Sequence, residues 1–317
     1  MEHRDGPVRS LTRRISSKVL TFLRWFALST AIWLTGIIAV ALYEKSLYEE
    51  PTTSAYSTAH FTIINEGVAK SDAQAVSDEL EQHYARILDD FGILSIPHVV
   101  VRLYPKGSRE FEDESGQAKR ENLQGFVGNS SVDTMYLQWA KEPNPDQPLL
   151  EEIGIEQFVR RVALHEFAHL VEHNVLYEKA MEDGWVTSRA DWRRTCLYNR
   201  THTYCDVPGW WSEAVAQYEG RAMATKELLT EYESRAASLE PTRFTNEDAY
   251  TYGRLLGEFV YKKWGTEGLH DMVTHNADTS AALGVSADEF NAGFREYAAE
   301  RMKGLLLQYK YTKQVTF

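Results

Sequence analysis

The sequence predicts an α+β fold with an N-terminal transmembrane helix, then a small mixed sheet with one helix, and then a mainly helical portion. Three observations predict it. A long uncharged apolar run lies near the N-terminus, short apolar segments rich in β-branched residues fill the chain up to residue 139, and helical periodicity dominates from about residue 155. Strands first and helices afterwards describe an α+β architecture rather than a repeat of β-α-β units.

The apolar run extends from Trp25 to Tyr43, nineteen residues without a charge. This length is close to the roughly 20 residues that a helix needs to cross about 30 Å of hydrocarbon. Residues 1–24 form a basic arm, so the positive-inside bias predicts a cytoplasmic N-terminus and a single-pass cell-membrane protein with an extracytoplasmic body. A cleaved signal peptide is the alternative, because Ala39–Ala41 is a small-x-small triplet after an apolar stretch.

The charges divide the chain at the same point. The 34 Lys and Arg side chains against 46 Asp and Glu give a formal net charge of −12; the first 43 residues carry +4, which leaves −16 on the rest. We therefore expect no nucleic-acid partner, and we expect strongly acidic substrates to be disfavoured. The oligomeric state stays open.

The folded body is expected at 59–305, after a stalk at 44–58 that is rich in Glu, Ser and Thr and before a C-terminal tail at 306–317. Its first element is a short apolar strand at 60–64. An amphipathic helix is predicted at about 71–91, because apolar residues recur there at three- and four-residue spacing.

Further strands precede the helical half. The segment 97–104 is dense in β-branched residues, which is typical of a core strand. Two short segments, 125–128 and 134–139, are expected in the same sheet, and three prolines after them mark a loop. Helical patterns separated by turn residues then follow. The expected helices are 155–177, 211–235, 246–264, 266–275 and 286–303.

The residues His165, Glu166 and His169 form an H-E-x-x-H pattern inside the first of these helices. Residues four apart lie one helical turn above each other, so the two imidazoles can bind one zinc ion. Glu166 projects beside them and can act as the general base toward a zinc-bound water.

Catalytic zinc requires a third protein ligand. We predict Glu213, in the first turn of the next helix, with Ser212 as its cap. Glu219 and Asp206 are the alternatives, and Glu213 could instead be a first-turn carboxylate that the helix dipole favours. His173 is eight residues from His165, about 12 Å along the helix axis, which is too far to share one ion.

Cys196 and Cys205 are the only cysteines. Their short spacing permits a disulfide in an oxidising compartment, in agreement with an exported body. Two unpaired buried thiols are the alternative. Neither a zinc ribbon nor a thioredoxin-type redox site is expected, because there is no C-x-x-C pair.

The motif from His165 to His169, followed by Trp211-Ser212-Glu213-Ala214-Val215-Ala216, resembles the gluzincin metallopeptidases, specifically the group called peptidase MA-like. The resemblance covers about Ala59 to Arg301. It implies a zincin-like domain with a zinc ion held by His165, His169 and Glu213, and it implies Glu166 as the base and proton shuttle. It also implies that a strand within 125–139 lines the cleft and holds an extended peptide.

The resemblance leaves two roles open. Thermolysin-like members have an Asp four residues after the ligand Glu, whereas this chain has Gln217, so the groups that orient the ligands are uncertain. Gluzincins often stabilise the oxyanion with a Tyr or His, and the candidates here are Tyr250, Tyr252 and His202.

Together these features predict a membrane-anchored, extracytoplasmic zinc metallopeptidase that hydrolyses peptide bonds in a peptide or protein substrate. One alternative is a catalytically idle, membrane-tethered binding or assembly module on the same scaffold. Another is a zinc amide hydrolase that acts on a non-protein substrate. An intact Glu166 favours an enzyme, because a scaffold needs metal ligands and not a base.

Overall fold

The computed structural model divides the chain into two compact units, Met1–Pro51 and Thr52–Phe317. In the first unit, five helical positions are described: Phe22, Trp25, Ser29, Thr30 and Trp33. In the second unit, the described ranges are 54–105, 107–115, 125–127, 131–139, 155–198, 202–205, 207–221 and 226–312.

The fold class predicted from the sequence includes a transmembrane helix at 25–43, and this prediction is wrong. Among the residues that the structure describes, no helix is both long enough and apolar enough to cross a membrane. The rest of the run, including the triplet Ala39–Ala41, lies outside the described residues. The corrected fold class is a small mixed sheet with a mainly helical body.

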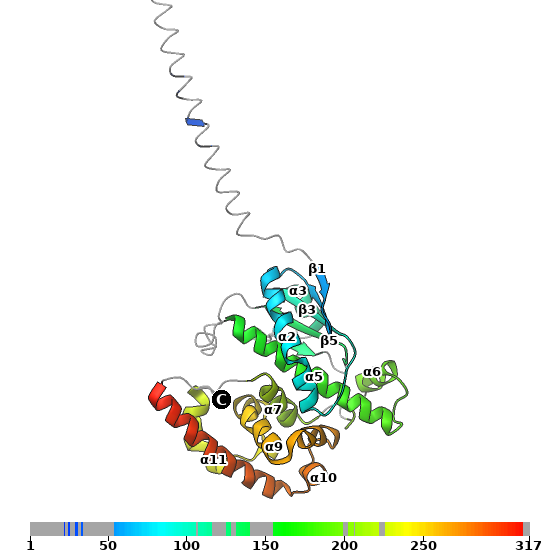
Figure 1. Cartoon of the computed structure of the whole chain (residues 1–317), viewed down its shortest axis with the longest axis vertical. Coiled ribbons are helices and arrows are strands. Elements are labelled where there is room, and N and C mark those ends of the chain that lie inside the picture. Colours follow the sequence, from blue (N-terminus) through cyan, green and yellow to red (C-terminus); the bar gives the residue numbers. More distant parts are fainter. Residues whose placement is uncertain are drawn as a thin grey trace, which may run out of the picture. The chain divides into compact units, whose positions relative to one another are not determined.

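In the described part of the chain, five strands form one sheet in the order β1-β2-β3-β5-β4. Figure 1 labels β1, β3 and β5 of this sheet. The strands are β1 (Ser54–Ser57), β2 (Phe61–Asn65), β3 (Val99–Pro105), β4 (Gly125–Val127) and β5 (Thr134–Trp139). The central strands β2, β3 and β5 run parallel, and β1 and β4 pair antiparallel at the two edges. The four predicted strands are confirmed. Strand β1 lies where a stalk is predicted, because its mostly exposed residues give no apolar pattern.

Two helices, α2 (Lys70–Asp90) and α5 (Ile155–Glu182), pack against the sheet and against each other. The ring of Phe61 on β2 lies 5.8 Å from Tyr84 of α2 and 5.3 Å from Phe167 of α5. Phe167 lies midway between His165 and His169 in sequence, so it projects from the opposite side of α5. Phe167 therefore faces the sheet and α2, while both histidines lie on the other side of α5.

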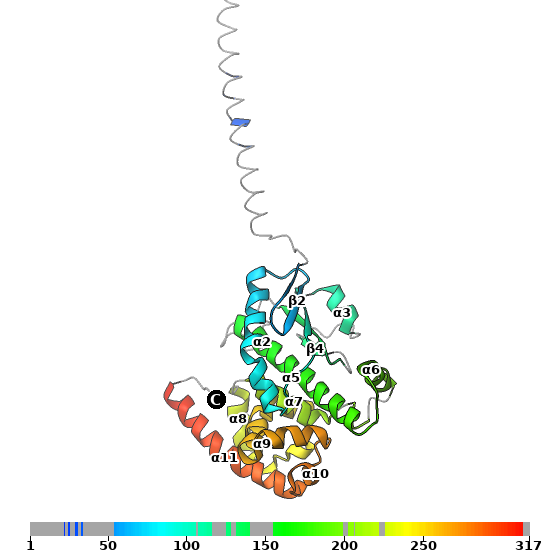
Figure 2. The ribbon, with the colours of Figure 1, turned by 45° about the vertical axis from the view of Figure 1, so that its right-hand side comes forward.

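Of the remaining described helices, one lies beside the sheet and the others follow α5 along the chain (Figure 2). They are α3 (Arg109–Ser115) beside the sheet, and α6 (Arg189–Tyr198), α7 (Gly209–Glu219), α8 (Lys226–Arg235), α9 (Asn246–Thr274), α10 (Thr279–Leu283) and α11 (Ala287–Thr312), with 3-10 turns at Ala236–Ser238 and Pro241–Arg243.

Three of the predicted helix boundaries are corrected. The helix predicted at 211–235 is two helices, because α7 ends at Glu219 and Arg221 takes the left-handed conformation with φ 52°. The helices predicted at 246–264 and 266–275 are one element, α9, with a kink at Gly265, where φ is 71°. Helix α11 continues to Thr312, so most of the predicted tail at 306–317 is helical.

Helices α7 and α9 cross at very short distance because α9 presents glycines to α7. A Cβ at Gly253 would lie 2.7 Å from the Cα of Ala214, and a Cβ at Gly257 would lie 2.4 Å from the Cβ of Tyr218. Helix α7 carries Glu213, so this contact positions the predicted third metal ligand.

We expect Gly257→Ala to lower the free energy of unfolding by about 1–3 kcal/mol, because the added methyl overlaps Tyr218 in a packed interface. Gly304→Ala is the matched control. Gly304 also lies within a long helix, but a Cβ there meets nothing within 4 Å, so the change should be neutral or stabilising. Chemical denaturation of both variants measures the difference, and equal stabilities would contradict the close crossing.

Candidate metal centre

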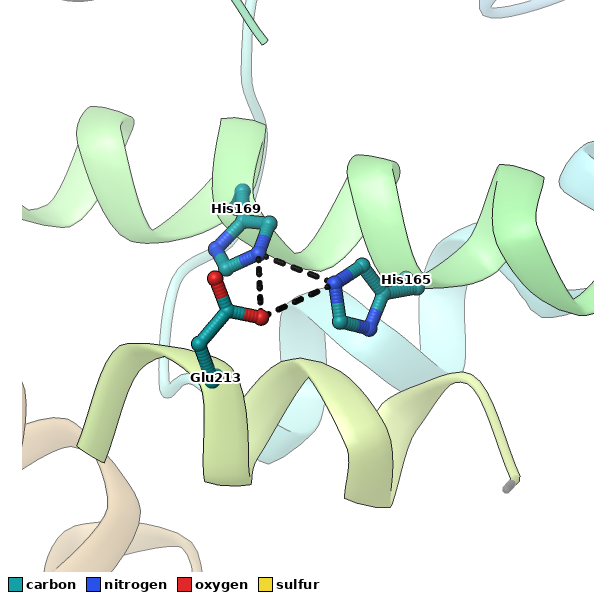
Figure 3. Close-up of side chains that lie close together, drawn as sticks. All are labelled: His165, His169 and Glu213. Atoms are coloured by element: carbon teal, nitrogen blue, oxygen red, sulfur yellow. Dashed lines mark hydrogen bonds and ion pairs between the residues drawn. The ribbon is translucent and has the colours of Figure 1, made fainter. Parts of the chain in front are cut away.

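Two helices bring three potential metal ligands together (Figure 3). The imidazoles of His165 and His169 project from α5, and the carboxylate of Glu213 projects toward them from α7. The two Nε2 atoms are 3.1 Å apart, and the Oε2 atom of Glu213 lies 3.3 Å from Nε2 of His165 and 3.7 Å from Nε2 of His169. This group could hold a metal ion.

The three side chains are mostly buried and strongly coupled. They are 12%, 15% and 17% exposed for His165, His169 and Glu213. Burial opposes ionisation of Glu213, yet hydrogen bonds with both histidines hold the pKa of its carboxyl well below the usual range. Burial likewise disfavours the charged form of His169, but the Glu213 carboxylate raises the pKa of His169 to about 9. A positive charge at this point is therefore strongly favoured, and a metal ion that displaced the protons could supply it.

Glu166 lies beside this group and is not one of its three members. Its side chain is 8% exposed, and burial raises the pKa of its carboxyl, while the charges of His165 and His169 oppose that shift. The backbone of Val127, on the edge strand β4, is hydrogen-bonded to the same carboxyl. The site thus joins α5, α7 and one edge of the sheet.

Ser212 and Glu172 form a hydrogen-bonded chain behind His169. The hydroxyl of Ser212 lies 3.1 Å from Nδ1 of His169 and donates to Oε1 of Glu172 at 3.0 Å. This chain fixes the ring of His169 so that its Nε2 points into the site. Ser212 is predicted as a helix cap, but α7 begins at Gly209, so Ser212 instead lies inside its first turn.

Gln217 occupies the position of the Asp in thermolysin-like members, but it does not orient a metal-ligand candidate here. The Cβ of Gln217 would lie 3.3 Å from a Cβ at Gly253, so Gln217 faces α9. The orienting role that the sequence leaves uncertain falls, for His169, to Ser212 and Glu172. The sequence-based predictions give Glu172 no role. Glu172 is a carboxylate in an otherwise apolar stretch of the helix, three residues after His169. This pattern could have indicated its role.

The other ligand candidates lie elsewhere. The Nδ1 of His173 is bonded to the carbonyl of Ser131 at 2.9 Å, and burial lowers the pKa of His173 to about 4, so it is neutral. Glu219 is fully buried against Arg86 of α2 and is not part of the group. Asp206 lies outside the described residues.

The three candidates for oxyanion stabilisation differ in their exposure and in their contacts. Tyr250 is 52% exposed, and its ring stacks on His165 with centroids 6.0 Å apart. Tyr252 is 0% exposed and packs against Phe244, so it has no surface for a substrate. His202 stacks on Trp185 at 4.3 Å, in the connection between α6 and α7. Tyr250 is thus in contact with a metal-ligand candidate.

Cys196 and Cys205 form a disulfide that links α6 to the segment before α7. The indole nitrogen of Trp192 donates to the carbonyl of Tyr204 at 2.9 Å beside it. These contacts fix the chain shortly before it enters the helix that carries Glu213.

No protein-family model fits this sequence, and no curated protein is significantly similar to it.

Proposed function

We propose that this protein is a zinc metallopeptidase, in line with its resemblance to the gluzincins. One observation carries the proposal: two imidazole nitrogens and one carboxylate oxygen from two helices lie within 3.1 to 3.7 Å of one another. A mixed set of His and carboxylate ligands from three protein side chains is typical of catalytic zinc sites.

The spacing of these atoms supports zinc as the ion. Zinc bonds of 2.0–2.1 Å at tetrahedral angles separate neighbouring ligand atoms by about 3.3 Å. The three observed separations, 3.1, 3.3 and 3.7 Å, lie close to that value. Three protein ligands leave the fourth tetrahedral position for water or substrate.

The residues around the ion supply the rest of the chemistry. Zinc held by His165, His169 and Glu213 would lower the pKa of a bound water toward 7 and would polarise a carbonyl group. Glu166, buried beside the ligands with a raised pKa, accepts the proton of the attacking water and returns it to the leaving amine. Tyr250, stacked on His165 and half exposed, can donate its hydroxyl proton to the developing oxyanion.

Strand β4 is suited to hold the substrate. It is the edge strand next to β5, and the backbone of its last residue, Val127, reaches the carboxyl of Glu166. An extended peptide added at such an edge is bound by its main chain, without a strong demand on its side chains.

The disulfide supports an activity outside the cytoplasm, since cystines persist mainly in oxidising compartments. Thiol labelling of the protein from its native cells, unfolded without reductant, tests this placement. Labelling of both Cys196 and Cys205 would contradict it.

Hydrolysis of a peptide library by the full chain tests the proposed activity. We expect cleavage that a chelator abolishes and that one equivalent of zinc restores. Zinc binding without cleavage of any peptide, protein or non-protein amide would instead favour an idle binding module.

A further inference from the structure

Helix α2 contacts both helices that carry the metal-ligand candidates. The ring of Tyr84 on α2 stacks on Phe167 of α5 with centroids 5.8 Å apart, and Phe167 lies between the two histidines of the candidate metal centre. Two residues later on α2, Arg86 reaches the C-terminal end of α7, the helix that carries the third ligand candidate. Helix α2 is therefore placed to set the spacing between the histidines and the carboxylate.

Arg86 binds α7 through both the side chain and the main chain of one residue. Its Nη1 donates to Oε2 of Glu219 at 2.5 Å, and its Nη2 donates to the carbonyl oxygen of Glu219 at 3.1 Å. The same Nη1 donates to Oδ2 of Asp90, on its own helix, at 3.0 Å. The guanidinium group thus lies at the C-terminal end of α7, where the helix dipole favours a cation. We call Arg86, Asp90 and Glu219 the Arg86 cluster.

The residue after Glu219 connects this cluster to the candidate metal centre. A Cβ at Gly220 would lie 3.2 Å from the Cβ of His165 and 3.1 Å from the carbonyl oxygen of Arg161, both on α5. Arg161 also donates from Nη1 to the carbonyl oxygen of Arg221 at 2.8 Å. The end of α7 that the guanidinium group holds therefore packs closely against the helical turn that carries the first histidine.

The Arg86 cluster contains two carboxyl groups and one guanidinium group, and little of it meets solvent. The exposed fractions of the side chains are 0% for Glu219, 9% for Asp90 and 29% for Arg86. With both carboxyls ionised, one cation would face two anions at a buried position, and an uncompensated buried charge is costly. A proton on one carboxyl removes the excess negative charge.

Burial identifies Glu219 as the carboxyl that holds the proton. Burial raises the pKa of Glu219 to about 8, while the charge of Arg86 lowers it and the charge of Asp90 raises it. Burial also raises the pKa of Asp90, but Arg86 opposes this shift through its charge and its hydrogen bond. At neutral pH the Arg86 cluster therefore contains one cation, one anion and one neutral acid.

The other ionisable groups near the Arg86 cluster leave this balance unchanged. Burial raises the pKa of Tyr218, whose ring lies 6.0 Å from that of Tyr261 of α9. Burial lowers the pKa of His83 on α2, so Tyr218 and His83 are both neutral at pH 7. Arg161 of α5 and Arg221 after α7 carry a positive charge throughout the working range of pH.

We propose that Arg86 and Glu219 are positioning residues of the candidate metal centre, and that Glu219 acts there as a neutral acid. The inference rests on the metal ion that the proposed function requires. The neutral carboxyl accepts from Arg86 and can donate its proton toward Asp90, which binds the same guanidinium nitrogen. The end of α7 is then fixed against α2 and α5. Glu213, six residues earlier and about 9 Å along the axis, is held within reach of both histidines.

Zinc affinity of the full chain, measured at pH 7 by competition with a chromophoric chelator, tests the positioning role. Glu219→Ala and Arg86→Gln should each weaken zinc binding about tenfold, as changes in groups that support metal ligands do. Glu219→Gln keeps the shape and the neutral charge of the protonated carboxyl, so it should bind zinc within about twofold of the wild type.

Two further variants complete this comparison. Arg194→Gln is the matched control, because it removes an exposed arginine that pairs with Asp191 inside α6, and it should leave zinc affinity unchanged. Arg86→Lys keeps the charge but not the paired donors, and it should weaken zinc binding less than Arg86→Gln does. It gives the same test if Arg86→Gln or Glu219→Ala does not fold.

The dependence on pH distinguishes a neutral Glu219 from an ordinary ion pair. Its pKa is higher in the folded chain than in the unfolded chain, so its contribution to stability is full below about pH 4 and is lost as the pH rises to about 8. Between about pH 5 and 8, the wild type should therefore lose more stability in chemical denaturation than Glu219→Gln. Above pH 8, zinc binding by the wild type should weaken relative to this variant.

Two results would overturn the inference and leave the proposed function standing. Wild-type zinc affinity in Glu219→Ala, Arg86→Gln and Arg86→Lys would remove the positioning role. Zinc binding as weak in Glu219→Gln as in Glu219→Ala, with the same dependence of stability on pH as the wild type, would show that Glu219 acts as an anion. A wild-type chain that binds no zinc would instead contradict the metal centre, and the positioning role would fall with it.

Discussion

The Glu166→Gln variant should bind one metal ion per chain and hydrolyse peptides about 10²- to 10⁴-fold more slowly than the wild type. Glu166 is buried beside the three ligand candidates and is not one of them, so its loss leaves the ligand set intact. Glutamine keeps the shape of the side chain but cannot accept a proton. The loss should therefore appear in kcat, with metal content and unfolding temperature nearly unchanged.

Glu182→Gln makes the same chemical change at an exposed position of the same helix, and its activity should be that of the wild type. Full turnover by Glu166→Gln would refute the assignment of Glu166 as the base. Loss of metal in that variant would place Glu166 among the ligands instead.

The second large effect is expected for Glu213→Ala. This substitution removes one of three ligand atoms and leaves His165 and His169 alone on α5. Changes in groups that only support metal ligands weaken metal binding by about 10- to 100-fold. Removing a ligand itself should exceed the upper value, and activity should fall with metal content. Competition with a chromophoric chelator measures the affinity.

The same experiment tests whether Glu213 is a metal ligand or only a first-turn carboxylate that the helix dipole favours. Glu247 is an exposed carboxylate in the first turn of α9, a position that the helix dipole favours. Glu247→Ala should leave metal affinity unchanged. If both variants bind metal as tightly as the wild type, Glu213 is only a first-turn carboxylate.

Local patterns in the sequence predict much of this fold. The spacing of apolar residues in α2 and the β-branched run of β3 encode buried faces directly, and both elements are confirmed. Strand β1 and helix α6 are not found in this way, because β1 is mostly exposed and α6 owes its place to tertiary contacts such as that between Trp192 and Tyr204. The transmembrane prediction used the length of an apolar run, and no described helix meets that criterion.

Some residues of the candidate site can likewise be predicted from local patterns, and others cannot. His165, Glu166 and His169 can be predicted because one helical turn determines their relative positions. Glu213 comes from a separate helix, and its choice as a ligand depends on the segment from Trp211 to Ala216. The contacts of Ser212 with His169 and Glu172, and the approach of Arg161 to Arg221, join residues 40 to 60 positions apart. No local pattern encodes such distances, so only the folded chain reveals them.

Metal analysis of the purified full chain tests the central claim most directly. Elemental mass spectrometry after exposure to equimolar zinc, manganese and nickel and removal of loosely bound ions should find one zinc per chain. The double variant His165→Ala/His169→Ala, treated identically, should contain none. A folded wild-type chain that retains no metal, or a double variant that retains as much zinc as the wild type, would contradict a metal centre at His165, His169 and Glu213.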